Sequence, residues 1–152
     1  MPQSLAKVSL HIVFSTKDRR PSLRDAGLRQ ELNAYMAAVL KDNVDSPAII
    51  INGVEDHIHA LINLSRKFAI MDVIQEMKTE TSKWLKTKSK DTTDFAWQSG
   101  YGAFSVSESN VEQVKEYIAS QEEHHKKVSF QDEFRAFCKR HNVELDERYV
   151  WD

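Results

Sequence analysis

The segment His57-Ile58-His59-Ala60-Leu61-Ile62-Asn63-Leu64 decides how this chain folds. Side chains on a β-strand alternate between its two faces, so residues two apart share a face. One face is wholly apolar and carries Ile58, Ala60, Ile62 and Leu64. The other face carries His57, His59, Leu61 and Asn63. The segment therefore predicts a strand that buries one face against helices and presents two neighbouring imidazoles on the other.

Three further strands are predicted around this one. Residues 48–51 are Ala-Ile-Ile-Ile and precede Asn52-Gly53, a pair typical of hairpin turns, so they are expected to pair with 57–64. Residues 8–14 alternate between apolar and polar side chains, which indicates a half-buried strand. Residues 103–107 follow the turn-rich stretch 98–102 and form the last predicted strand.

Helical spacing of apolar residues fills the intervals between the strands. It predicts helices from Ser22 to about Leu40, over 70–85, and from a cap at Ser109 or Asn110 to about Lys127. Ser129-Phe130-Gln131-Asp132 resembles a capping box for a last helix, with a stop at Asn142. The order indicates an α+β fold, a ferredoxin-like antiparallel sheet of four to five strands with helices packed on it. We expect one domain over residues 1–152, with 129–152 as a C-terminal helical tail.

Composition describes an ordinary globular chain. Of its 152 residues 41% are hydrophobic and 29% are charged, and a single cysteine, Cys138, rules out an intramolecular disulfide. The sequence has no apolar run of the ~20 residues that a membrane span needs, and no leader is evident at its start. We therefore expect a cytoplasmic protein without a membrane partner.

The net charge of −2 weighs against binding to nucleic acid, but the distribution of charge softens this. Residues 17–29 hold five basic and two acidic side chains, and residues 78–90 hold five lysines and one glutamate. A phosphate chain responds to such local patches more than to the total charge. Solvated loop or helix faces would give the same clusters, so charge alone leaves the question open.

The His57–His59 pair is the first candidate for chemistry. Two imidazoles on one strand face suit a divalent metal, because neutral histidine is a common ligand. Two surface histidines would give the same pattern. The spacing excludes a histidine-triad hydrolase, which needs a histidine where Leu61 stands, and a zinc β-lactamase-like site, which needs Asp-His in place of Leu61-Ile62.

A second candidate lies in the helix predicted from residue 109. Tyr117 and Gln121 are four residues apart and therefore share a helix face. An amphipathic helix whose tyrosine is half-packed explains that pair by itself. Together with the histidines, however, it supplies a metal site with a phenol beside it, which is the equipment for breaking a phosphodiester bond with a tyrosine nucleophile.

The chain resembles the single-tyrosine, IS200-like transposases, the small transposases of insertion sequences that move as single-stranded DNA. Glu55-Asp56-His57-Ile58-His59 looks like their HUH motif (His, hydrophobic, His). Similar segments recur in order along nearly the whole chain. They are residues 16–21, 78–82, 97–107, 117–125 and 146–152.

The resemblance implies a mechanism and a set of partners. Tyr117 would attack a DNA phosphate and stay attached through a 5′-phosphotyrosine, while His57, His59 and Gln121 would hold Mg²⁺ or Mn²⁺. It also implies a homodimer, an HUH endonuclease fold and imperfect DNA hairpins at the element ends as the partner. Whether the tyrosine helix acts in cis or in trans is left open.

Charge adds candidate phosphate contacts, and alternatives to a transposase remain. The candidates are Lys17, Arg19, Arg20, Lys78, Lys83 and Lys86. Related enzymes are a domesticated HUH endonuclease that acts on host repeats and an HUH nuclease of plasmid replication or conjugation, against which the short length argues. A non-catalytic module that binds single strands is the remaining alternative, and it predicts binding that needs neither the metal nor Tyr117.

Overall fold

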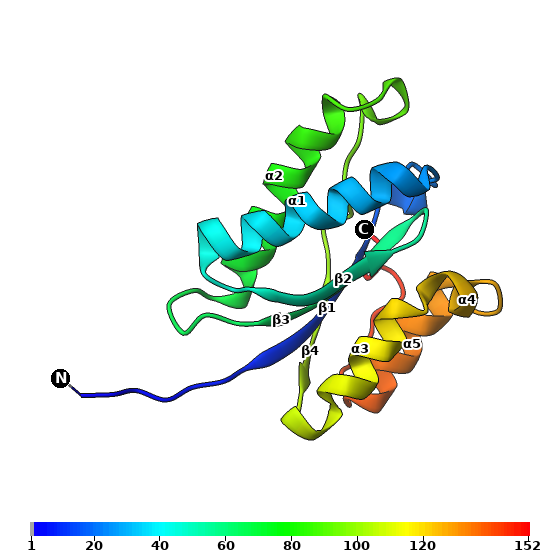
Figure 1. Ribbon diagram of the computed structural model, residues 1–152. Helices are drawn as coiled ribbons and strands as arrows, with labels where there is room; N and C mark the ends of the chain where they lie inside the picture. The colour runs from blue at the N-terminus through cyan, green and yellow to red at the C-terminus, as the bar shows by residue number, and fades with distance from the viewer. Residues whose placement is uncertain (1) are drawn as a thin grey trace.

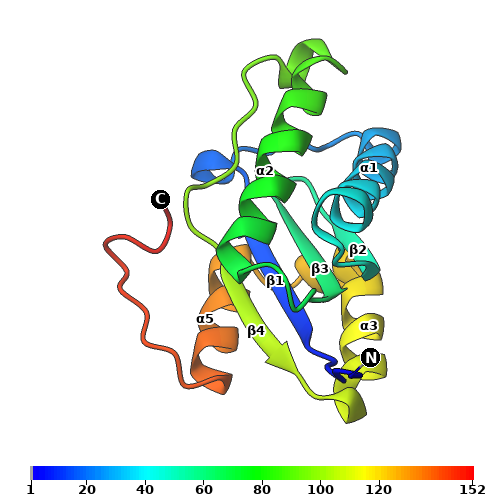
Figure 2. The ribbon, with the colours of Figure 1, turned by 90° about the vertical axis from the view of Figure 1, so that its left-hand side faces the viewer.

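The computed structural model describes residues 2–152 as one antiparallel sheet covered by helices on both faces (Figures 1 and 2). The strands are β1 (Ser9–Ser15), β2 (Ala48–Gly53), β3 (His57–Asn63) and β4 (Gly102–Val106), in the order β2-β3-β1-β4. This order and the β-α-β-β-α-β sequence of elements confirm the predicted ferredoxin-like α+β fold, with four strands.

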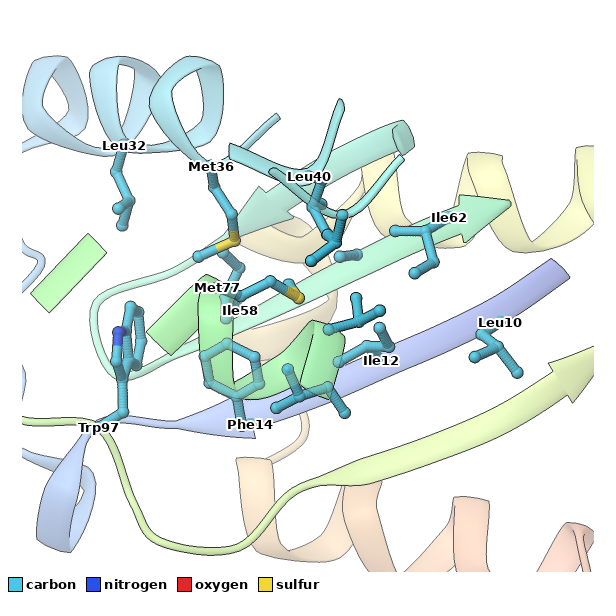
Figure 3. Close-up of a cluster of buried hydrophobic side chains, with 14 of the residues drawn as sticks. Leu10, Ile12, Phe14, Leu32, Met36, Leu40, Ile58, Ile62, Met77 and Trp97 are labelled. Carbon is cyan, nitrogen blue, oxygen red and sulfur yellow. The ribbon is translucent and has the colours of Figure 1, made fainter. Parts of the chain in front are cut away.

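The first face of the sheet carries the larger hydrophobic core. Helices α1 (Ala26–Val44) and α2 (Ile70–Lys86) lie across it, and Figure 3 shows their side chains meeting those of β1 and β3. Leu10, Ile12 and Phe14 point here from β1, as the period of two requires. Asp25 caps α1 by accepting hydrogen bonds from the backbone of residues 27 and 28, so that helix begins four residues after the predicted start.

The second face of the sheet is also covered, and this places the histidines inside the protein. The 3₁₀ turn η3 (Glu108–Asn110) leads into α3 (Val111–Ala119), which is followed by α4 (Gln121–His125) and α5 (Phe130–Arg140). These helices lie on the side of the sheet opposite α1 and α2 (Figure 2). Val13 and Phe104 pack there against three phenylalanines of α5. His57 and His59 project into this layer and are fully buried instead of lying on a solvated face.

The helix predicted over 109–127 is interrupted. Its regular part ends at Ala119, and Ser120 has φ −100° and ψ 24°, outside the helical range. The Asn52 side chain donates from Nδ2 to the carbonyl oxygens of Ile118 (2.9 Å) and Ala119 (3.3 Å). These bonds satisfy carbonyls at the end of α3 that have no intrahelical partner, and α4 begins after the break, at Gln121.

The Asn52-Gly53 pair ends β2 and does not form the hairpin turn that was predicted for it. Both residues remain paired with β3, opposite His59 and Ile58, and the connection runs through residues 54–56. A Cβ at Gly53 would lie 2.6 Å from the carbonyl oxygen of His57. Glycine is therefore required at this position by the close approach of two backbones.

The C-terminal region contains one helix and then folds back on the protein. Ser129 caps α5 by accepting from the backbone of Asp132, and Asn142, with φ 55°, ends it in the left-handed conformation expected of a stop. The segment 141–152 is irregular, and Gly100 N donates to Asp152 O at 2.9 Å. Within residues 2–152 no helix is both long enough and apolar enough to cross a bilayer.

Candidate active site

The two strand histidines define the centre of the site. The His57 Nδ1 lies 2.7 Å from the Asp56 carboxylate, and the His59 Nδ1 lies 2.8 Å from His11 Nε2. His11 comes from β1, on the same face of the sheet. In each histidine one ring nitrogen is therefore engaged by a neighbour, and the Nε2 atom faces the helical layer. A histidine held in this way by its second nitrogen is pre-oriented to bind a metal.

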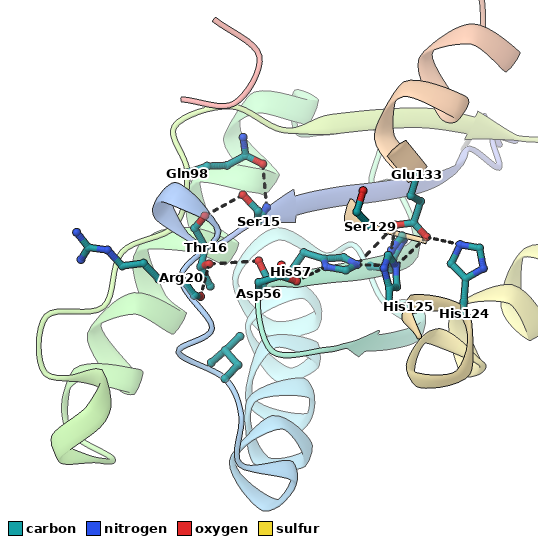
Figure 4. Close-up of polar contacts among 12 residues, drawn as sticks. Ser15, Thr16, Arg20, Asp56, His57, Gln98, His124, His125, Ser129 and Glu133 are labelled. Carbon is teal, nitrogen blue, oxygen red and sulfur yellow. Dashed lines mark hydrogen bonds and ion pairs between the residues drawn. The ribbon is translucent and has the colours of Figure 1, made fainter. Parts of the chain in front are cut away.

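Helix α5 places a carboxylate in front of both Nε2 atoms. Figure 4 shows this Glu133 side chain next to His57, His124 and His125. Glu133 is 3% exposed, and its Oε1 lies 2.9 Å from His59 Nε2 and 3.5 Å from His57 Nε2. Its Oε2 lies 3.0 Å from His125 Nε2 at the end of α4. The potential ligand atoms of these four residues all lie within 4.8 Å of one another.

Tyr117 reaches the rim of the same cluster from α3. Its hydroxyl hydrogen-bonds to the Glu133 carboxylate and to His124 Nε2, the latter at 2.9 Å. Its ring centroid lies 5.9 Å from that of His59. The tyrosine therefore lies beside both strand histidines of its own chain.

Burial and neighbouring charge control the ionisation of Tyr117 and Glu133. Burial raises the pKa of the Tyr117 hydroxyl well above its usual range, and the Glu133 carboxylate adds to the rise. Burial also opposes ionisation of Glu133, but its hydrogen bonds with His125, His57 and His59 outweigh burial and hold the pKa of the carboxyl well below its usual range. The phenol is therefore protonated and the carboxylate charged.

The histidines respond differently to the same surroundings. Burial lowers the pKa of His59 to about 4 and that of His11 to about 3, so both rings are neutral at pH 7. Burial acts on His57 as well, but hydrogen bonds with Asp56 and Glu133 outweigh it and raise the pKa of that ring. The neutral rings keep a lone pair that is available to a cation.

Gln121 is completely buried at the first position of α4. Its Nε2 donates to the Tyr117 carbonyl oxygen at 3.3 Å, but no group in residues 2–152 donates a hydrogen bond to its Oε1. An unpaired buried acceptor costs about 1–3 kcal/mol. A bound cation would relieve that cost, so the amide oxygen is chemically suited to the ligand role that was predicted for it.

The basic residues predicted to contact DNA fall into three groups. Lys17, Arg19 and Arg20 lie in the loop after β1, where the backbone N of Thr16 bonds to the Asp56 carbonyl, next to His57. In Figure 4 the Arg20 side chain points away from the histidines. Lys83 and Lys86 are exposed on α2, on the other face of the sheet.

Lys78 is engaged inside the protein. Its ammonium group donates to the carbonyl oxygens of Gln98 (2.8 Å), Ser99 (3.3 Å) and Gly100 (2.7 Å). Burial lowers its pKa to about 8. The side chain therefore ties α2 to the segment before β4.

Sequence reasoning missed three members of the cluster: His11, His125 and Glu133. For His125 the sequence allowed contact with DNA or metal but favoured a solvated helix end, and Glu133 carried no signal beyond its place in an amphipathic helix. The period of two in residues 8–14 does place His11 on the polar face of its strand. The contacts of His125 with His57 and of Glu133 with His59 span 68 and 74 residues, so no local pattern encodes them.

Comparisons with known proteins agree with this arrangement. The family described as "Transposase IS200 like" matches residues 4–121. The fold is similar to that of a candidate transposase from Deinococcus radiodurans R1 (TM-score 0.60, 19% identity, 80% of this chain and 95% of that chain). It is also similar to a REP-associated tyrosine transposase bound to a REP hairpin (TM-score 0.60, 14% identity, 84% of this chain and 74% of that chain). A comparison with curated proteins gave no match.

Proposed function

Since this chain belongs to the IS200-like transposase family, we propose that it cleaves and rejoins single-stranded DNA through a covalent bond to Tyr117. The observation that carries the proposal is the position of the Tyr117 hydroxyl. It lies at the edge of a buried cluster that contains both histidines of the HUH motif, in the same chain. A phosphate held at that cluster would be within reach of the phenol.

The chain's own residues fit a divalent metal. His57 and His59 offer imidazole nitrogens, and Gln121 offers a buried oxygen to which no group of residues 2–152 donates. The metal would supply Lewis-acid chemistry, polarising the scissile phosphate and offsetting its charge. Mg²⁺ and Mn²⁺ are the proposed ions, and imidazole ligands favour Mn²⁺ of the two.

Tyr117 is the proposed nucleophile. Its oxygen attacks phosphorus, a Tyr–O–P bond forms, and the bond from phosphorus to the 3′ oxygen breaks, leaving a 3′-hydroxyl and a 5′-phosphotyrosine. A free phenol has a pKa of ~10 and is a weak nucleophile at neutral pH, so the site must assist loss of its proton. The 3′-hydroxyl of another strand reverses the step and joins the ends without a separate energy source.

Hairpin-forming single-stranded DNA is the proposed substrate. The REP-associated tyrosine transposase of similar fold is bound to a REP hairpin, which supports this class of partner. We propose phosphate contacts at Lys17, Arg19 and Arg20, because their loop is bonded to the residue before His57. We also propose a homodimer, which rests on the resemblance to the family.

The exposed lysines at the end of α2 form a separate proposed contact. Replacing Lys83, Lys86 and Lys88 by alanine should weaken hairpin binding and reduce the slope of log affinity against log salt, because each phosphate contact releases counterions. Binding and salt dependence identical to those of the wild type would remove this patch from the DNA path.

The deciding experiment is a cleavage assay on labelled single-stranded DNA from the ends of the element, with Mg²⁺ or Mn²⁺. We expect a protein–DNA adduct that survives denaturing electrophoresis. The adduct should be absent from Tyr117→Phe and from His57→Ala/His59→Ala. Tyr149→Phe is the matched control, because Tyr149 is 64% exposed, whereas the cluster is buried.

Three other outcomes would change the proposal. Cleavage without an adduct would make water the nucleophile and the protein a metal-dependent nuclease. Binding without cleavage, unaffected by Tyr117→Phe and independent of metal, would make it a single-strand-binding module. Cleavage through Tyr117 of host repeats that are not part of a mobile element would indicate a domesticated enzyme.

A further inference from the structure

Glu133 is a buried carboxylate that forms no ion pair with a lysine or arginine within residues 2–152. The ion pairs formed by its carboxylate within residues 2–152 are with His57, His59, His124 and His125. A buried carboxylate is costly unless a compensating charge is close. Lysine and arginine, the usual counter-ions, are not among these partners. The imidazoles supply hydrogen bonds but carry no fixed charge, so a divalent cation is the group that would balance this carboxylate.

The spacing of the atoms is that of ligands around one ion. His57 Nε2 and His125 Nε2 are 3.0 Å apart, His59 Nε2 and Glu133 Oε1 are 2.9 Å apart, and His125 Nε2 and Glu133 Oε2 are 3.0 Å apart. Adjacent ligand atoms about 2.1 Å from an octahedral ion are themselves ~3.0 Å apart.

The orientation of the rings agrees with this reading. Asp56 and His11 engage the Nδ1 atoms of His57 and His59, which leaves both Nε2 atoms directed at Glu133. Metal-bound histidines characteristically use their second nitrogen in this way. Three separate elements (β3, the end of α4 and α5) thus converge on one point with nitrogen and oxygen donors.

We propose that His125 and Glu133 are ligands of the metal together with His57 and His59, so that the C-terminal helix α5 is part of the metal centre. Both added ligands lie beyond residue 121, where the family match ends. The inference rests on the proposed function for what the metal does to DNA. Metal binding itself is measured without DNA and without turnover.

The test is a titration of the full chain with Mn²⁺, in which electron paramagnetic resonance measures the bound and free ion. Glu133→Gln keeps the size of the side chain and removes its charge, and it should weaken Mn²⁺ binding at least tenfold, as should His125→Ala. Loss of a residue that merely supports a ligand costs about 10–100-fold. Glu116→Gln, the same change at an exposed position of α3, should leave binding unchanged.

Amide hydrogen exchange gives a readout that needs no substitution. Saturating Mn²⁺ should slow exchange across Phe130–Arg140 as well as across β3 in the wild type, because a ligand on α5 couples the two elements. Slowed exchange in β3 with unchanged exchange in α5 would overturn the proposal. This measurement decides the matter even where Glu133→Gln fails to fold.

The variants separate this inference from the proposed function. Wild-type affinity in Glu133→Gln and His125→Ala, with binding lost in His57→Ala, would refute the added ligands and leave the transposase mechanism standing. Unchanged affinity in His57→Ala as well would refute the metal centre of both proposals. Tyr117→Phe should form no DNA adduct, and its Mn²⁺ affinity is measured alongside the adduct yield, because its hydroxyl contacts Glu133 and a loss of chemistry must be told apart from a loss of metal.

Discussion

Replacing Gly53 by alanine should disturb the site from the backbone. A Cβ at this position would lie 2.6 Å from the His57 carbonyl oxygen and 3.2 Å from the Ile58 Cα. Both are backbone atoms of the strand that carries the histidines, so relief requires β2 and β3 to separate. Overpacking of this kind costs about 1–3 kcal/mol. The wild-type hydrogen bond from Val54 N to the same carbonyl oxygen, 3.1 Å long, would be weakened by this displacement. Its loss adds about 1 kcal/mol to the destabilisation of the variant.

The assay is urea unfolding of the metal-free protein, followed by circular dichroism. A loss of roughly 2–4 kcal/mol, with an m-value of about 2 kcal/mol/M, shifts the midpoint by about 1–2 M. Because the displaced atom belongs to His57, Mn²⁺ affinity should fall in parallel. The expected loss is steric, since Gly53 does not have a positive φ.

Gly100→Ala is the matched control. Its added Cβ would have its nearest neighbour at 3.5 Å, an ordinary contact, and Gly100 has no positive φ either. A glycine replaced without strain gains about 0.4–1 kcal/mol from the lower entropy of the unfolded chain. Equal midpoints for Gly53→Ala and Gly100→Ala would refute the argument that close backbone approach fixes the position of His57.

Three further predictions concern the groups that hold the site. Asn52→Ala should lower the free energy of unfolding by about 1 kcal/mol and reduce the adduct yield, because it releases the end of α3. The control is Asn43→Ala, which removes one exposed hydrogen bond to a side chain and should lower the free energy of unfolding in urea by less. His11→Phe should weaken Mn²⁺ binding about 10–100-fold in a titration, because His59 loses the partner of its Nδ1; wild-type affinity would contradict this. The pKa values of His11 (about 3) and His59 (about 4) lie below the ordinary histidine value of 6.5, so between pH 6.5 and 4 the unfolded state binds more protons at these residues than the folded state does. The free energy of unfolding should therefore fall as the pH drops through this range. The slope of the free energy of unfolding against pH should be smaller in His11→Phe, which lacks one of the two groups.

The arrangement of strands and helices was predictable because its signals are local. The alternation in residues 8–14 and 57–64 follows from burying one face of a strand, and the structure has β1 and β3 there. The stop at Asn142 follows from the ease with which asparagine adopts a left-handed conformation, and its φ is 55°. The break at Ser120 was missed because its cause, the Asn52 side chain, is more than sixty residues away in sequence.

The sequence by itself determined the class of the fold and the presence of two histidines on one strand face and a tyrosine and a glutamine four residues apart. Each of those patterns lies within one element. Tertiary structure decided that the second face of the sheet is covered, that His57 and His59 are buried, and that Glu133 and His125 stand in front of them. The physical reason is that strand and helix periodicity fix which side of an element a residue occupies, whereas packing of separate elements fixes which sides meet.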